Sequence, residues 1–265
     1  MTNRIDLKFR ELKRKGKKAL IVYLTCGYPN IAATEKLVLE LDRKSAVDII
    51  ELGVPFSDPL ADGPVIQAAS SSALKNKIDL RKIFSLVARL RKKTQIPLCL
   101  MGYYNPILSF GQAAFIRASV SCGVDGVIVP DLPPEEDRDL IKLAKKNNIA
   151  TIFFLSPTSP AERIKYISHI SSGFIYYVSL TGVTGARKNL APYVRRNVYA
   201  IKRFTGKPVC VGFGLSSAGH ISEVFKFADG AIVGSAVVKM IQENLGRKNL
   251  VSRVGKFVET LNPKH

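Results

Sequence analysis

The chain of 265 residues is 46% hydrophobic and 23% charged, a composition that supports a folded core without disulfide or metal staples and excludes an intrinsically disordered protein. No apolar run reaches the roughly 18 residues of a membrane span and the N-terminus lacks the apolar segment of a secretory signal, so we expect no membrane partner and a location in the cytoplasm, or in the plastid stroma for an organelle-encoded chain. The net charge of +19 is spread along the chain with no nucleic-acid-binding motif beside it, which favours a solvated basic surface over a nucleic-acid partner.

The cysteines and histidines predict no metal site. The cysteines form no C-x-x-C pair, and three of them lie in or beside apolar runs, as reduced core cysteines do. No two histidines have the spacing of metal ligands on one helix. These residues are Cys26, Cys99, Cys122, Cys210, His169, His220 and His265.

Short apolar runs alternate with amphipathic segments from one end of the chain to the other. Runs that are apolar on both faces are typical of buried parallel strands. The eight runs occupy residues 19–24, 48–53, 97–102, 126–130, 150–155, 174–179, 208–214 and 230–235.

The segments between the runs have the periodicity of amphipathic helices. Asp79 is placed to cap a helix over 79–93, and a Pro-Glu-Glu-Asp sequence suits the first turn of a helix over 134–147. We expect the remaining helices over 3–14, 32–44, 159–170 and 190–204, with 250–261 extending the final helix.

Eight strand–helix units in about 240 residues predict an α/β protein of the (β/α)8 TIM-barrel class. We expect a single domain over residues 1–265, with an extra N-terminal helix over 3–14 that is placed to close the N-terminal mouth of the barrel. A doubly wound open sheet is the alternative fold.

In a barrel of this class the functional site forms at the carboxyl ends of the strands. Glu51 lies in the second predicted strand and, by the alternation of strand side chains, points the same way as Ile49. An ionised carboxylate is costly to bury there, so the pKa of Glu51 should rise toward neutral pH, as a general acid or base requires. The alternative is a glutamate that only meets solvent at the end of its strand.

The connection after the second strand is the longest in the predicted barrel, and it contains Asp58 and Asp62. Long loops on this fold usually carry function. On spacing alone, however, the sequence Asp62-Gly-Pro favours a turn or a helix cap over a catalytic acid.

Glycines at the ends of the last two strands predict a phosphate site. Gly214 ends the seventh strand, and Gly234 and Ser235 end the eighth, just before a helix whose positive end would face the site. Free backbone N–H groups in that setting bind phosphate. The alternative is that these glycines serve tight turns only.

Together these residues indicate an acid–base enzyme that acts on a small phosphorylated metabolite. No lysine lies at a strand end to form a Schiff base, so a carbon–carbon cleavage would need a substrate that accepts the electrons itself. Two other readings remain open at this point. One is a different phosphate-binding barrel enzyme, such as an isomerase or a synthase, and the other is a basic binding protein without turnover.

Six motifs carry a resemblance to a known family. The longest is ELGVPFSDPLADGPVIQ over 51–67. The others are MGYYNP (101–106), VPDLP (129–133), SLTGVTG (179–185), VGFG (211–214) and AIVGSA (231–236). In this order and spacing they resemble the tryptophan synthase alpha subunit over essentially the whole chain.

The resemblance implies a lyase of tryptophan biosynthesis that cleaves indole-3-glycerol phosphate to indole and glyceraldehyde 3-phosphate. In this retro-aldol reaction indole is both the leaving group and the electron sink. By family likeness, Glu51 protonates C3 of the indole ring, Asp62 accepts a hydrogen bond from the ring N–H, and Tyr176 matches the catalytic tyrosine. This reverses the first reading of Asp62. It leaves open whether Glu51 also removes the proton of the glycerol hydroxyl.

The resemblance also implies a substrate pocket, with a lid over 179–189. The phosphate would be held by Gly185, Gly214, Gly234 and Ser235. The indole ring would be walled by Tyr23, Met101, Tyr103 and Phe213.

Finally, the resemblance implies a partner, the beta subunit, in an α2β2 heterotetramer. The pyridoxal phosphate cofactor is expected only in that partner, so this chain should bind no cofactor and no metal of its own. The loop residues expected at the interface are Asp58, Pro59, Asn105 and Asp131.

Overall fold

The computed structural model describes residues 2–136, 138–179, 190–212 and 214–263. Within this part of the chain, parallel strands form one sheet in the order β5-β4-β3-β2-β1-β9-β8-β7-β6. They are β1 Ala19–Thr25, β2 Ile49–Gly53, β3 Leu98–Met101, β4 Gly126–Ile128, β5 Ala150–Ile152, β6 Phe154–Leu155, β7 Ile175–Val178, β8 Val209–Gly212 and β9 Gly230–Val233.

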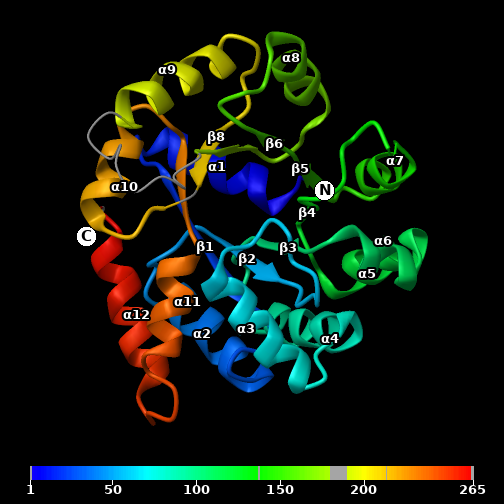
Figure 1. Ribbon diagram of the computed structural model, residues 1–265, viewed down its shortest axis with the longest axis vertical. Coiled ribbons are helices and arrows are strands. Elements are labelled where there is room, and N and C mark those ends of the chain that lie inside the picture. Colours follow the sequence, from blue (N-terminus) through cyan, green and yellow to red (C-terminus); the bar gives the residue numbers. More distant parts are fainter. Residues whose placement is uncertain (1, 137, 180–189, 213, 264–265) are drawn as a thin grey trace.

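The sheet is a barrel (Figure 1). Its two end strands, β5 and β6, are consecutive parts of the fifth predicted run and are separated only by Phe153. The strand order therefore returns to its starting point. The predicted (β/α)8 barrel is confirmed, and the alternative of an open doubly wound sheet is wrong.

Helices surround the strands, as Figure 1 shows. None in the described ranges is long and apolar enough to cross a membrane. They are α1 Arg4–Arg14, α2 Ile31–Arg43, α3 Pro64–Lys75, α4 Leu80–Arg91, α5 Tyr104–Phe110, α6 Gln112–Cys122, α7 Arg138–Lys146, α8 Ala161–Ile170, α9 Leu190–Lys202, α10 Ala218–Phe225, α11 Ser235–Gln242 and α12 Leu250–Leu261.

Two helix predictions need correction. Residues 134–136 form a turn, in which the Glu136 N–H donates to the Pro133 carbonyl, and α7 begins at Arg138. Proline and acidic residues suit a turn as well as a first helical turn, which explains the error. The segment 250–261 does not extend α11: it is a separate helix, α12, which packs on α2 and α11. The predicted cap at Asp79 is confirmed, since its carboxylate accepts the Lys82 N–H at 2.8 Å.

The barrel interior forms its own apolar cluster, distinct from the layer between strands and helices. At the N-terminal end of the strands, α1 fills this interior with Ile5, Phe9 and Leu12, all buried. Figure 1 shows α1 in the middle of the ring of helices. The predicted closure of this mouth by the N-terminal helix is confirmed. The opposite mouth, at the carboxyl ends of the strands, is hollow.

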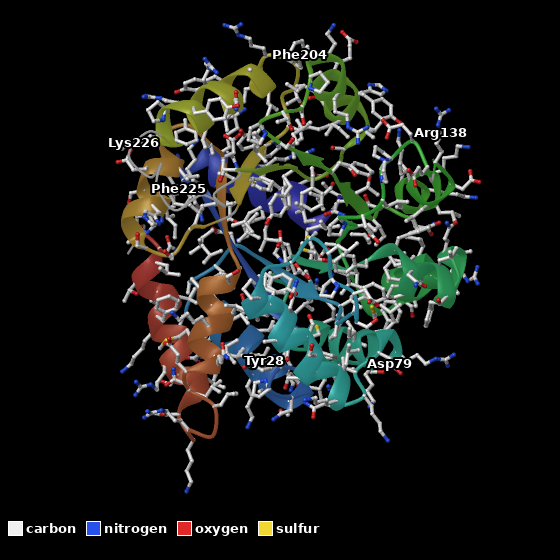
Figure 2. The ribbon with its side chains drawn as sticks, in the orientation of Figure 1. Tyr28, Asp79, Arg138, Phe204, Phe225 and Lys226 are labelled. Carbon is white, nitrogen blue, oxygen red and sulfur yellow. The ribbon has the colours of Figure 1, made fainter. Side chains whose placement is uncertain are left out.

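The outer rim of the molecule is polar and basic. Side chains on the outside of the helix ring project away from the barrel, with Arg138 and Lys226 labelled on this rim in Figure 2. Many of the ion pairs on the outer helices join residues three or four positions apart in one helix, as Lys226 pairs with Glu223.

Candidate active site

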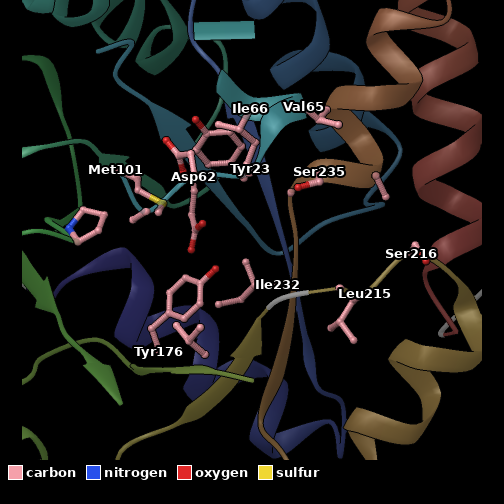
Figure 3. A pocket seen from close by; sticks show the side chains of 18 of the residues that line it. Tyr23, Asp62, Val65, Ile66, Met101, Tyr176, Leu215, Ser216, Ile232 and Ser235 are labelled. Atoms are coloured by element: carbon pink, nitrogen blue, oxygen red, sulfur yellow. The ribbon is translucent and has the colours of Figure 1, made fainter. Parts of the chain in front are cut away.

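A cavity of about 880 Å³ opens at the carboxyl ends of the strands, where the fold predicts a site. Figure 3 shows Tyr23 and Asp62 on one wall, Tyr176 on the facing wall and Ser235 to one side. The strand residues that line the cavity are Tyr23, Glu51, Met101, Phe154, Leu155, Tyr176, Val178 and Ile232.

Glu51 lies in the middle of β2, paired in register with Tyr23 of β1 and Cys99 of β3. It lines the cavity, and Ile49, two residues before it, belongs to the interior cluster, as strand alternation predicts. Glu51 is completely buried, and within the described residues neither of its carboxyl oxygens has a hydrogen-bond partner. This burial raises the pKa of Glu51 to about 8.

Asp62 lies on the long connection between β2 and α3, in a turn where its N–H donates to the Pro59 carbonyl at 3.0 Å. It is not the cap of α3: Gly63 occupies that position, with Pro64 in the first turn. The cap alternative for Asp62 is therefore wrong. The half-buried carboxylate lines the cavity, and burial raises its pKa to about 6 against the opposing effect of a hydrogen bond from Tyr103.

Tyr103 stabilises the turn that contains Asp62. Its hydroxyl accepts the Ala61 N–H at 2.9 Å and donates to the Asp62 carboxylate, and its ring stacks on Phe56 with ring centroids 5.3 Å apart. Tyr103 is buried and does not itself line the cavity. The structure thus places it next to the catalytic carboxylate predicted at Asp62, in contact with the loop.

Two tyrosines reach the cavity because the neighbouring strand has a glycine where their rings lie. A Cβ atom on Gly53 would come within 2.0 Å of the Tyr23 hydroxyl, and one on Gly212 would come within 2.5 Å of the Tyr176 ring. Both rings are buried, and Glu51 and Asp62 both contribute to raising the pKa of each phenol, after burial itself. The two carboxylates therefore act on the same small region of the cavity.

The predicted phosphate residues lie together at the other side of the cavity. Gly214, Gly234 and Ser235 all line it, and Gly214 has a φ of +71°. α11 begins at Ser235 with no side-chain cap, so its first N–H groups have no partner within the helix and its positive end is open to the cavity. This arrangement suits an anion.

Some predicted residues lie outside the cavity or outside the described ranges. Gly185, Phe213 and the lid predicted over 179–189, apart from Ser179, belong to the residues that the structure does not describe. Three of the four residues predicted at a partner interface lie on loops, Asp58 and Pro59 after β2 and Asp131 after β4. Asn105 lies instead in the first turn of α5, which follows β3. All four are on the side of the molecule where the cavity opens. Asp58, Asn105 and Asp131 are exposed there, and Pro59 is half-buried.

Several lining residues were not predicted from the sequence. Phe154, Val178 and Ile232 are strand residues that line the cavity, as Glu51 does. The sequence does not single them out, because apolar residues in strands also fit an ordinary core. Lys239 lies one helical turn beyond Ser235 on α11. Among the described residues, no group of three or more His, Cys, Asp or Glu side chains is placed to hold a metal ion.

Comparison with known proteins agrees with this geometry. The family model described as tryptophan synthase alpha chain matches residues 9–263. The tryptophan synthase alpha chain of Geotalea uraniireducens is 48% identical over 259 residues, covering 98% of this chain and 96% of the relative. That of Geotalea daltonii is 46% identical and covers 97% of each chain.

Solved structures give the same result. Tryptophan synthase subunit alpha from Legionella pneumophila superimposes with a TM-score of 0.91 at 36% identity, covering 98% of this chain and 97% of that one. A structure from Pyrococcus furiosus, solved to explain mutual activation in that organism's α2β2 tryptophan synthase complex, gives 0.85 at 40% identity, covering 92% and 97%. The chain belongs to the tryptophan synthase alpha chain family.

Proposed function

We propose that Glu51 and Asp62 carry out the reaction of this family in the present chain, the cleavage of indole-3-glycerol phosphate to indole and glyceraldehyde 3-phosphate in tryptophan biosynthesis. One observation carries the proposal: Glu51 is completely buried without a hydrogen-bond partner among the described residues, in the same cavity as Asp62. A buried polar group left without a partner is costly, and such groups are common where a substrate supplies the missing contact.

The two raised pKa values divide the acid–base work. With a pKa of about 8, Glu51 is protonated at neutral pH and can donate its proton to C3 of the indole ring. With a pKa of about 6, Asp62 is largely ionised there and can accept a hydrogen bond from the ring N–H. Asp62 thereby stabilises the positive charge that protonation places on the ring.

Bond cleavage follows from that charge. The electron pair of the bond between ring C3 and the glycerol carbon returns to the ring, and the glycerol hydroxyl becomes the aldehyde as it loses its proton. After its first transfer Glu51 is a carboxylate with no other partner among the described residues, and we assign it the removal of this proton. The step restores protonated Glu51 and needs no external oxidant, reductant or cofactor in this chain, because indole itself accepts the electrons.

The remaining cavity residues fit the rest of the substrate. The open N-terminus of α11 and the backbone at Gly214 and Gly234 offer N–H groups to the phosphate. Tyr23 and Met101 offer apolar surface to the indole ring at the Asp62 side of the cavity. Tyr176 faces them across the cavity and limits its width (Figure 3).

The mouth of the cavity also suits a protein partner, which we propose is a tryptophan synthase beta subunit that holds the pyridoxal phosphate. Beside the exposed Asp58 and Asn105, Leu60 is 92% exposed and Leu108 is 56% exposed. Large apolar side chains exposed together with polar loops are typical of interaction surfaces. Replacing Leu60 by Asp should weaken binding of the beta subunit in gel filtration and leave the lyase rate of the isolated chain unchanged.

The decisive experiment measures indole release from indole-3-glycerol phosphate by the wild type and by the Glu51→Gln and Asp62→Asn variants. We expect release by the wild type and a loss of about 10²–10⁴-fold in each variant, the usual contribution of a general acid or base. Circular dichroism melting of the same samples checks that the variants are folded. A variant that stays within tenfold of the wild-type rate would refute the role assigned to its carboxyl group.

A further inference from the structure

The cavity does not end at Ser235: it continues along one face of α11. Ser235, Lys239 and Glu243 are spaced four residues apart, and all three line the cavity. In this structure the Lys239 ammonium lies near Glu243, one turn further along the helix. Side chains in a helix lean toward its N-terminus, so the Lys239 side chain can also reach back over the turn that begins at Ser235. In that position the Lys239 ammonium would lie close to the backbone N–H groups of the proposed phosphate site.

Lys239 is distinguished by the weakness of its ion pairing. Two basic residues line the described part of the cavity, and the other, Arg163, is paired with Glu135. Among the described residues, Glu243 is the only carboxylate within ion-pair distance of the Lys239 ammonium. Their separation of 3.8 Å is too long for a hydrogen bond, and both side chains are more than half exposed. A pair of this kind contributes little. Lys239 can therefore leave Glu243 at little cost when a stronger anion arrives.

A phosphate monoester is such an anion, because it carries close to two negative charges at neutral pH. The backbone N–H groups at the start of α11 supply partial charges but no full positive charge. We propose that Lys239 is a positioning residue for the substrate phosphate: it moves from Glu243 to the phosphate when substrate binds, and Glu243 competes with the substrate for it. The inference rests on the proposed function, since it takes indole-3-glycerol phosphate as the ligand.

The test compares Lys239→Met with Glu243→Gln, which should act in opposite directions. In Lys239→Met we expect the KM for indole-3-glycerol phosphate to rise about three- to tenfold with kcat within twofold of wild type. In Glu243→Gln, where the competing carboxylate is gone, KM should fall. Lys239→Arg keeps the charge and should restore most of the affinity. The difference between wild type and Lys239→Met should shrink as salt is added.

Two controls separate the proposed contact from other effects. Lys226→Met removes the same charge from an exposed ion pair at the C-terminal end of α10 and should leave KM unchanged, which excludes an effect of net charge alone. Calorimetric titration with glycerol 3-phosphate and with indole separates the two parts of the substrate: Lys239→Met should weaken binding of the phosphate ester and leave that of indole unchanged.

Equal affinities of wild type and Lys239→Met for glycerol 3-phosphate would overturn the proposal. So would an equal loss for glycerol 3-phosphate and indole, since that indicates damage to the cavity as a whole. The titration does not depend on turnover. If the wild type released no indole, the proposed function would fail, while the glycerol 3-phosphate titration would still decide whether Lys239 binds a phosphate ester.

Discussion

The two ends of the barrel treat a buried carboxylate in opposite ways. At the closed N-terminal end, Asp125 is 3% exposed and its carboxylate accepts hydrogen bonds from Arg91 at 2.6 Å, Arg4 at 2.9 Å and the Leu98 N–H at 2.9 Å. At the open end, Glu51 is equally buried, and no described residue bonds its oxygens.

This difference supports a structural role for Asp125 and the catalytic role that we propose for Glu51. Asp125 joins α1, α4 and the start of β3, so its charge is matched by the groups that it holds in place. Glu51 makes no side-chain hydrogen bond to a described residue, so its burial lowers the stability of the folded protein. The other buried side-chain atoms without a partner among the described residues are neutral: the hydroxyls of Ser119, Ser168 and Ser171 and the amide oxygen of Asn244. A carboxyl group is more costly to leave without a partner, and such a group is expected at a functional site.

The largest effect on stability is expected at the closed end. Asp125→Asn would leave two guanidinium groups near a neutral amide, and breaking a buried ion pair in this way costs about 3–5 kcal/mol of unfolding free energy. Urea unfolding measures it, with the exposed Asp139→Asn as a matched control that should change stability by less than about 0.5 kcal/mol. A loss at Asp125 no greater than that at Asp139 would remove the distinction between the two ends.

Glu51→Gln should have the opposite sign, and its size should depend on pH. Between pH 4.5 and about 8 the folded protein holds a proton on Glu51 that the unfolded chain has lost, so wild-type stability falls as the pH rises through this window. Glutamine has no such proton. The free energy of unfolding of the variant should therefore exceed that of the wild type by on the order of 2–4 kcal/mol at pH 8 and by almost nothing at pH 4.5. Urea unfolding across this range tests the expectation, and a difference that is constant with pH would contradict it.

The smallest effect is expected on replacing Tyr103, whose hydroxyl donates a hydrogen bond to Asp62. The Tyr103 hydroxyl lowers the pKa of Asp62, so in Tyr103→Phe this pKa should rise above its value of about 6. The proposed mechanism needs ionised Asp62 and protonated Glu51, so kcat/KM should follow a bell-shaped pH profile whose acidic limb moves to higher pH in the variant. We expect about a tenfold loss at pH 6 that narrows toward pH 7.5. A uniform loss at all pH values would mean that Tyr103 acts only on the shape of the loop.

Much of the fold could be predicted from the sequence because parallel barrel strands are buried on both faces and read as apolar runs. The break at Phe153, which divides the fifth run into β5 and β6, leaves no mark in composition. The start of α7 was misplaced because prolines and acidic residues suit turns and helix starts alike.

The site was only partly visible in the sequence. Strand alternation predicted that Glu51 points into the barrel, and the structure confirms that it is buried and lines the cavity, while its catalytic role stays a prediction. For Asp62 even the candidacy needed the family resemblance, because its neighbours fit a turn equally well. Tyr103 was expected in the indole wall, and its contact with Ala61 and Asp62 depends on a loop path that no local pattern encodes. Lys239 lies a helical turn beyond the last strand, and only the three-dimensional course of α11 brings it to the cavity.

Because α1 fills the N-terminal end of the barrel, it restricts how small molecules reach and leave the cavity. Ile5, Phe9 and Leu12 fill the N-terminal end of the interior, and the described residues leave no passage on that side. A molecule that enters at the carboxyl ends of the strands is therefore expected to leave the same way. The substrate and both products would therefore pass through the same opening, at the carboxyl ends of the strands. A protein bound over this opening would control both substrate entry and product release, and it would be the first to contact a released product.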